Sequence, residues 1–384
     1  MAEPANSQPA GVSIRHLYKV FGPTPERFIQ AVRDGMSKQE LRDTHGHVLG
    51  LRDINIDMPA GGIQVVMGLS GSGKSTLIRH INRLIDPTSG EVLVQVDGQT
   101  VDVVQMNARQ LRQFRREQTA MVFQKFALFP HFTVLENTEY GLRVQGIKHK
   151  QQRERAMRWI ERVGLKGYED SYPNQLSGGM QQRVGLARAL TNDAPILLMD
   201  EAFSALDPLI RSDMQGVLLD IQQEIGKTIV FITHDLDEAL RLGDRIAILR
   251  DGEVVQQGTG QQIVLQPADD YIANFVRDVN RGRVVRSRTL LQPGAPVDGP
   301  TVDASMVIEE VARLLSAEGK DAANVVSSKG KHLGTLAMSD IIAAIVPPAA
   351  PVPVDDAAAA TAQTPSAARA ADDPLRTAPS NVAG

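Results

Sequence analysis

A glycine-rich loop is the feature that most constrains the fold of this chain. Residues 68–76 read GLSGSGKST and directly follow an apolar run at 63–67. This order predicts a strand, a tight loop and a helix, with backbone N–H groups converging on a phosphate. A Gly/Ser loop that matches by chance is the alternative, and the flanking strand and helix patterns argue against it. We therefore expect an α/β fold with a nucleotide at the edge of its sheet.

The chemistry of this loop suits ATP. Lys74 supplies a positive charge for the β- and γ-phosphates, Ser75 supplies a hydroxyl oxygen for Mg²⁺, and Thr76 adds a phosphate contact. The predicted nucleotide-binding residues of the loop are Gly68, Leu69, Ser70, Gly71, Ser72, Gly73, Lys74, Ser75 and Thr76.

Two carboxylates follow a second apolar run. Residues 196–199 read ILLM, the pattern of a strand buried on both faces, and Asp200 and Glu201 come next. Buried acids need a cation or a proton to offset their charge. We assign Asp200 to Mg²⁺ and Glu201 to the attacking water as general base. An exposed acidic turn is the alternative, and the adjoining text at 204–207 argues against it.

The runs LSGGMQ at 176–181 and ILLMDEAFSALD at 196–207 resemble two motifs of the ATP-binding-cassette (ABC) family. The resemblance implies that the first motif closes over ATP bound to a second copy of the chain. It also implies that the loop ending at Asp207 senses that copy. The residues expected to act in this way are Ser177, Gly178, Gly179, Gln181 and Asp207.

Two further residues take their roles from the same resemblance. Gln124 matches the glutamine that binds Mg²⁺ and links the phosphate site to a transmembrane partner, and His234 matches a histidine that contacts the γ-phosphate. Without the family context, Gln124 reads as a solvated loop residue and His234 as a residue that caps a helix start. Glu201 and His234 are thus the predicted catalytic residues, and Ser75, Gln124 and Asp200 the predicted magnesium ligands.

The chain is similar to the ATPases of quaternary-amine importers, the glycine betaine, choline and proline group. The resemblance covers residues 12–285 and includes an insertion at 23–46, the text GHVLGLRDINIDMPAGGIQVVMGLSGSGKST and residues 271–281. It implies that an aromatic side chain stacks on adenine, and Phe21 and Tyr18 are both candidates. It also implies a quaternary ammonium cargo, whereas an importer of another small solute, such as an amino acid, is the first alternative. A soluble ABC ATPase that acts outside transport is the second.

Length and composition limit the other possibilities. The 384 residues suffice for one cassette with small additions, and the phosphate motif occurs once, so a second half-site must come from another chain. The chain has no cysteine, which fits a reducing cytoplasm, and its formal charge of −4 argues against a nucleic-acid partner. We expect no secretory signal and no membrane span.

The expected fold is α/β, a P-loop NTPase cassette with a RecA-like parallel core, an antiparallel β flank and an α-helical subdomain. Residues 1–11 are expected to be flexible, and 12–285 to form the cassette, with a helical insertion at 23–46 and the helical subdomain at about 122–180. Residues 286–346 are expected to include a helix, two strands and a second helix capped by Ser339, an order that resembles one cystathionine-β-synthase-type (CBS) repeat, either regulatory or dimerising. The Ala/Pro-rich tail 347–384 is expected to be disordered.

The resemblance further implies partners and a place in the cell. The chain would pair with itself under two permease subunits, on the cytoplasmic face of the plasma membrane, as a peripheral subunit. An extracytoplasmic substrate-binding protein would deliver the cargo. Residues 126–137 are the expected contact with the permease, although packing within a loop would also explain their apolar character.

Overall fold

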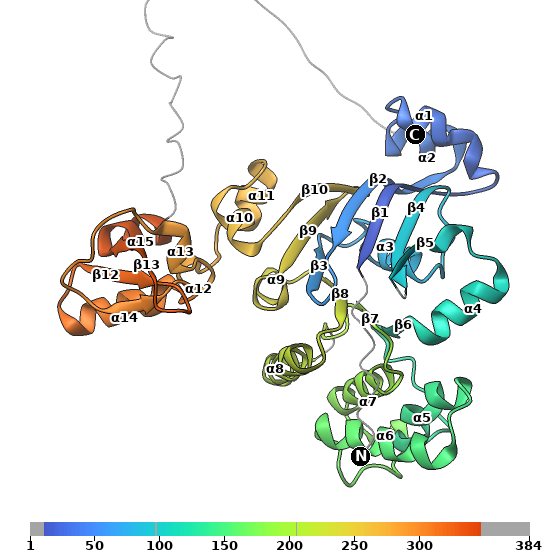
Figure 1. Ribbon diagram of the computed structural model, residues 1–384. Coiled ribbons are helices and arrows are strands. Elements are labelled where there is room, and N and C mark those ends of the chain that lie inside the picture. The colour runs from blue at the N-terminus through green and yellow to red at the C-terminus, as the bar shows by residue number, and fades with distance from the viewer. Residues whose placement is uncertain (1–10, 97, 205, 347–384) are drawn as a thin grey trace, which may run out of the picture. The chain divides into compact units, whose positions relative to one another are not determined.

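The computed structural model describes residues 11–96, 98–204 and 206–346. Its central sheet has six strands in the order β10-β9-β3-β8-β7-β6 (Figure 1). All neighbouring strands are parallel except β9 and β10. The strands are β3 (Ile63–Met67), β6 (Thr119–Val122), β7 (Ile196–Asp200), β8 (Thr228–Thr233), β9 (Arg245–Arg250) and β10 (Glu253–Gly258).

The strands β3, β7 and β8 are buried along their whole length, which explains their apolar sequences. Successive side chains of a strand point to opposite faces, so each of these strands contributes to two cores. Leu197 and Met199 pack with one set of helices, whereas Ile196 and Leu198 pack toward the other face of the sheet. The parallel core predicted from the sequence is confirmed.

A second sheet is antiparallel and has the order β2-β1-β4-β5. Its strands are β1 (Val12–Phe21), β2 (Val48–Met58), β4 (Ser89–Val96) and β5 (Gln99–Asp102). Its apolar face shares a core with α3 (Lys74–Ile81) and with the central sheet. This is the expected antiparallel flank.

The insertion between β1 and β2 is helical. It contains a 3₁₀ turn (Pro25–Phe28), α1 (Ile29–Arg33) and α2 (Lys38–His45), and it builds a small core against Tyr18 and Leu49. The Ser37 hydroxyl accepts from the backbone N–H of Glu40 and so caps α2. Thr24 has a left-handed backbone, and its side chain makes no capping bond.

Three helices form the expected helical subdomain (Figure 1): α5 (Val134–Val144), α6 (His149–Arg162) and α7 (Gly178–Thr191). Trp159 is buried in their core. The remaining elements of the cassette are α4 (Ala108–Glu117), α8 (Pro208–Ile225), α9 (Leu236–Leu242) and the 3₁₀ turns Val103–Gln105 and Pro173–Gln175.

Four short helices lead from the cassette into a C-terminal unit that has its own core. These helices are α10 (Gly260–Leu265), α11 (Asp270–Phe275), α12 (Arg281–Val284) and α13 (Ser287–Leu290). The unit contains β11 (Thr301–Asp303), α14 (Ile308–Glu318), β12 (Ala322–Val326), β13 (His332–Ala337) and α15 (Met338–Ile345). Its sheet has the order β11-β12-β13.

The helix–strand–strand–helix order follows the expectation for the C-terminal unit. However, α15 begins at Met338, so Ser339 lies within its first turn and does not precede it. The predicted disordered tail at 347–384 and most of the flexible segment at 1–11 lie outside the described residues. Within the described part of the chain, no helix is both long and apolar enough to span a membrane.

Candidate nucleotide-binding site

Four adjacent parallel strands end at one edge of the central sheet, and the predicted site residues follow those ends. The phosphate loop follows β3, Gln124 follows β6, Asp200 ends β7 with Glu201 next, and His234 follows β8. Because β3, β8, β7 and β6 are neighbours in parallel register, residues far apart in sequence meet there.

The phosphate loop folds around the Lys74 side chain. The ammonium donates to the carbonyl oxygens of Gly68 and Leu69 at 2.9 and 3.1 Å. Lys74 is only 4% exposed, and this burial lowers the pKa of its ammonium, although nearby Glu201 opposes the shift. Gly68 has φ 146°, and a Cβ there would lie 2.1 Å from the carbonyl oxygen of Leu249, so the loop requires glycine at this position.

The carboxylate of Asp200 is held beside the start of α3. Ser75 Oγ donates to Asp200 Oδ1 at 2.7 Å, and Arg79 donates to Oδ2 at 3.1 Å. Asp200 is 3% exposed, so these two partners compensate a buried charge. Arg79 escaped the sequence analysis, although its position one helical turn after Ser75 placed it on the same face of α3.

Glu201 is the point at which the other polar groups meet. Its Oε2 accepts from Gln124 Nε2 at 2.9 Å and lies 3.8 Å from His234 Nδ1, while its Oε1 lies 3.7 Å from Lys74 Nζ. The residue has φ 46°, which is unusual for a side chain other than glycine. This strained turn directs the carboxylate toward the phosphate loop.

These groups border a hollow of about 400 Å³. Phe21 also borders it and is 37% exposed, whereas Tyr18 is 7% exposed and belongs to the core of the insertion. Phe21 is therefore the aromatic side chain available for stacking. The hollow is lined by Phe21, Lys38, Val48, Leu49, Gly50, Ser70, Gly71, Gly73, Lys74, Ser75, Thr76, Gln124 and Glu201.

The sequence did not predict four further residues of this lining: Lys38, Val48, Leu49 and Gly50. The last three belong to β2, where Val48 pairs with Phe21, so the strand pairing was the missing signal. A Cβ at Gly50 would lie 2.6 Å from the Phe21 ring, which shows how closely this ring approaches the backbone of β2. Lys38 comes from the insertion, and its position depends on the tertiary fold.

The residues predicted to act on a second copy's ATP lie elsewhere in the described chain. Ser177 Oγ accepts from the N–H of Met180 at the start of α7, and Asp207 accepts from the N–H of Ile210 at the start of α8. Gln181 donates to two backbone carbonyls near the start of α7. Gly178 and Gly179 form the first turn of α7. The LSGGMQ motif at 176–181 thus forms the start of a helix and is not part of the lining of the chain's own hollow.

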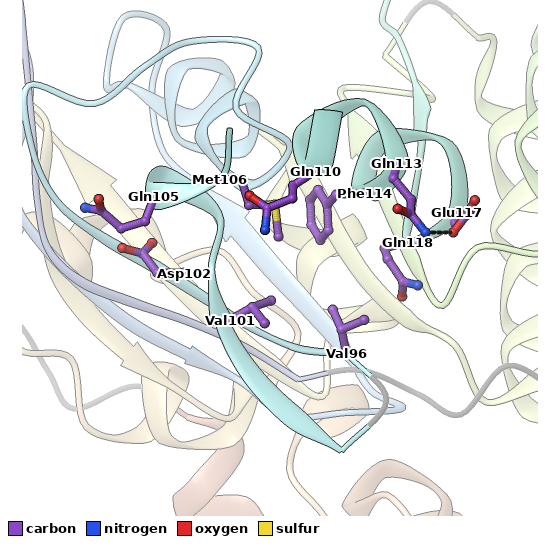
Figure 2. Close-up of a pocket in the computed structure, with 10 residues that line it drawn as sticks. All are labelled: Val96, Val101, Asp102, Gln105, Met106, Gln110, Gln113, Phe114, Glu117 and Gln118. Carbon is purple, nitrogen blue, oxygen red and sulfur yellow. Dashed lines mark hydrogen bonds between the residues drawn. The ribbon is translucent and has the colours of Figure 1, made fainter. Parts of the chain in front are cut away.

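Size alone does not single out the nucleotide hollow. A second hollow, of about 390 Å³, lies between β5 and α4, and Figure 2 shows its lining residues, including the hydrogen bond from Gln113 to Glu117. Its lining shares no residue with the nucleotide hollow. The first hollow is the one with a phosphate loop, a buried lysine and the Glu201 carboxylate, so chemistry decides between the two.

The residues at the hollow can hold a hard cation. Ser75, Asp200 and Gln124 offer hydroxyl, carboxylate and amide oxygens, the donor types that Mg²⁺ prefers. Among the described residues there is no group of three or more His, Cys, Asp or Glu side chains suited to a metal. Such a sparse set suits Mg²⁺, which keeps waters and shares its shell with phosphate oxygens.

Known proteins agree with this geometry. Residues 51–204 match the ABC transporter family. The chain is 46% identical to the glycine betaine transport ATP-binding protein OpuAA of Bacillus subtilis, over 87% of this chain and 78% of that protein. This chain belongs to the ABC transporter family. The chain is therefore an ATPase coupled to transport.

Two other relatives and one solved structure extend the comparison. The subunit is 45% identical to ProV of Salmonella typhimurium, a glycine betaine/proline betaine transport ATP-binding protein, over 87% of this chain and 82% of ProV. It is 44% identical to the trimethylamine N-oxide transport system ATP-binding protein TmoW of Ruegeria pomeroyi, over 85% of this chain and 94% of TmoW. The dimeric post-hydrolysis structure of the cassette MJ0796 bound to ADP and Pi superposes on this chain with a TM-score of 0.54 at 32% sequence identity. The superposition covers 65% of this chain and 98% of the MJ0796 chain. The ABC subunit therefore binds ATP, and its fold is one that dimerises.

Proposed function

We propose that this chain is the ATP-hydrolysing subunit of an importer for a quaternary ammonium osmolyte, such as glycine betaine, choline or proline betaine. The observation that carries the ATPase assignment is the meeting of polar side chains at four neighbouring strand ends, namely Lys74, Gln124, Asp200, Glu201 and His234. The cargo rests on the names of the relatives OpuAA and ProV.

ATP would lie along the hollow, with adenine on Phe21 and its phosphates in the loop 68–76. Ser70, Gly71 and Gly73 line the hollow, and their amides would donate to phosphate oxygens, while Lys74 would exchange its carbonyl partners for the β- and γ-phosphates. Stacking and charge-assisted hydrogen bonds supply the binding free energy.

Mg²⁺ would be held by Ser75 directly, by Asp200 through water, and by Gln124. When bound, it neutralises charge on the β- and γ-phosphate oxygens. The Ser75–Asp200 hydrogen bond fixes both side chains in advance. Gln124 donates through Nε2 to Glu201, which orients its carbonyl Oε1 as the atom that can bind the cation.

Glu201 would accept the proton of the attacking water, and His234 would contact the γ-phosphate. Both are needed at the same place, and Glu201 Oε2 lies 3.8 Å from His234 Nδ1. Since phosphoryl transfer depends chiefly on positioning and charge stabilisation, this small set is sufficient once the phosphates are enclosed.

A second copy would complete the enclosure. Ser177, Gly178, Gly179 and Gln181 lie at the start of α7, where unpaired N–H groups and the helix dipole favour an anion. Offered to the γ-phosphate of the partner's ATP, they supply donors that the chain's own hollow lacks, and Asp207 would report closure between the copies. Closing and opening with each ATP would drive the permease.

The permease would contact a third hollow, of about 360 Å³, bordered by Phe129, Tyr140 and Arg188. The centroids of the Phe129 and Tyr140 rings lie 4.5 Å apart. Arg188 Nη1 donates to the carbonyl oxygen of Ala127 at 2.8 Å. The expected contact segment 126–137 therefore forms part of an aromatic wall. The subunit would sit at the cytoplasmic membrane face, with an extracytoplasmic binding protein supplying cargo.

The C-terminal unit at 286–346 resembles one CBS repeat in its element order. Two roles fit a single repeat: pairing with the same unit of a second copy to sense a ligand or ionic strength, or dimerisation alone. Its separate core supports treating it as a domain of its own.

Uptake measurements test the cargo. Cells of the source organism with this gene deleted should take up little radiolabelled glycine betaine, and the wild-type gene should restore uptake whereas Lys74→Ala should not. Trimethylamine N-oxide is the second candidate because TmoW is 44% identical over most of both chains. Restored uptake of this compound or of an amino acid, with no change for betaine, would replace the proposed cargo.

A further inference from the structure

The helical insertion reaches the nucleotide hollow through one charged side chain, that of Lys38. Lys38 lines the hollow together with Phe21 and Val48 from the antiparallel sheet and with Lys74 from the phosphate loop. It is the first residue of α2 and is half-buried. The insertion therefore adds a second lysine to the lining of the site.

The backbone around Lys38 is fixed at two points. Ser37 caps α2 through the N–H of Glu40, and Arg52 Nη2 donates to the carbonyl oxygen of Met36 at 2.5 Å. Arg52 is itself paired with Glu253 of β10 at 3.2 Å. These bonds attach the segment before Lys38 to β2 and β10, so the lysine stem starts from a defined place beside the hollow.

The present partner of Lys38 is weakly bound. Its Nζ lies 3.5 Å from Asp251 Oδ1, and the two side chains are 42% and 76% exposed. An exposed pair of this kind contributes little to stability and exchanges readily. Asp251 lies at the turn between β9 and β10, where Gly252 donates its N–H to the carbonyl of Ser72 at 3.1 Å. The turn that carries the Asp251 carboxylate is thus hydrogen-bonded to the phosphate loop.

We propose that Lys38 is a nucleotide-binding residue, which leaves Asp251 and donates a hydrogen bond to the nucleotide when the hollow fills. This inference rests on the proposed function, since it requires the hollow to hold ATP. The long flexible stem of lysine and its three donors suit an exchange between two acceptors. Asp251 competes with the nucleotide for the same ammonium.

Calorimetric titration of the full-length chain with Mg–ADP tests the exchange. ADP lacks the γ-phosphate, so hydrolysis does not complicate the binding curve. Lys38→Ala should weaken ADP binding about fivefold, the effect of a half-exposed, charge-assisted hydrogen bond. Asp251→Asn should tighten binding, because Asn tolerates the left-handed turn (φ 52°) and releases the lysine. The double variant should bind like Lys38→Ala alone.

Two controls separate this inference from the proposed site. Arg42→Ala removes a cation from the same helix, paired with neighbouring Asp43, and should leave ADP affinity unchanged. Lys74→Ala should weaken binding strongly. Wild-type affinity in Lys38→Ala, or undiminished tightening by Asp251→Asn in the double variant, would overturn the inference alone. Wild-type affinity in Lys74→Ala would instead remove the proposed nucleotide site.

Discussion

At the scale of single residues, the proposed chemistry depends on one carboxylate, that of Glu201. Glu201→Gln keeps the size of the side chain but cannot accept a proton from water. We expect ATP hydrolysis to fall by a factor of roughly 10² to 10⁴, the usual contribution of a general base. ATP affinity should be retained, because Lys74 and the loop are unchanged. A phosphate-release assay with parallel ATP titration measures both; hydrolysis at the wild-type rate would exclude this base.

His80 makes stability depend on pH. The residue is fully buried in α3, with Nδ1 bonded 2.7 Å from the carbonyl of Thr76, and burial lowers its pKa from 6.5 to about 4. The unfolded chain therefore takes up the proton first, so stability is intact above pH 6.5 and is lost as pH falls toward 4. Between pH 7.5 and 5 the loss should be about 2 kcal/mol.

Urea unfolding at these two pH values measures that loss. Glu139 and Glu238 are also buried, with raised pKa values, and they act in the opposite direction at low pH. The informative quantity is thus the difference between wild type and His80→Leu, which lacks the titrating ring. An equal pH dependence in the two proteins would contradict the expectation.

At the scale of elements, the phosphate loop and the β9–β10 hairpin are packed backbone to backbone. A methyl group at Gly68 would collide with the Leu249 carbonyl, which belongs to β9. Gly68→Ala should therefore move the loop, destabilise the fold by about 2 kcal/mol or more, and weaken ATP binding.

Gly216 lies inside α8 with open space around it, so Gly216→Ala should stabilise the folded state by about 0.5–1 kcal/mol. Thermal and urea unfolding of both variants measures the contrast.

Elements also show what could be predicted from the sequence. The strand and loop at 63–76 and the strand at 196–200 were predictable because their apolar runs, glycines and acids are local signals. Lys38 was not predictable, since its role depends on the packing of an insertion against β2 and β10. The choice between Phe21 and Tyr18 likewise required burial, because both are aromatic residues of β1 with similar local sequence.

At the scale of the whole molecule, the two halves of the proposed catalytic apparatus lie apart in one chain. The lining of the hollow with Lys74 and Glu201 does not include the start of α7, and Ser177, the residue before α7, accepts through Oγ from the N–H of Met180 in the first turn of that helix. In the proposed mechanism one chain therefore does not enclose its own ATP, and a second copy is required. Composition supports this argument only indirectly, through the single phosphate motif in 384 residues.

Dimerisation should accordingly depend on ATP and on the helix start at α7. With Glu201→Gln, which slows hydrolysis, Mg–ATP should convert the chain to a dimer, whereas Mg–ADP should not, because the γ-phosphate is the group that α7 of the partner would contact. Adding Ser177→Arg should abolish the dimer, since the larger side chain replaces the hydroxyl and fills the space for that phosphate. ADP affinity should stay unchanged, because Ser177 lies outside the chain's own hollow. Light scattering with each nucleotide measures the mass; a dimer that persists with Ser177→Arg and ATP would show that the copies associate through another surface.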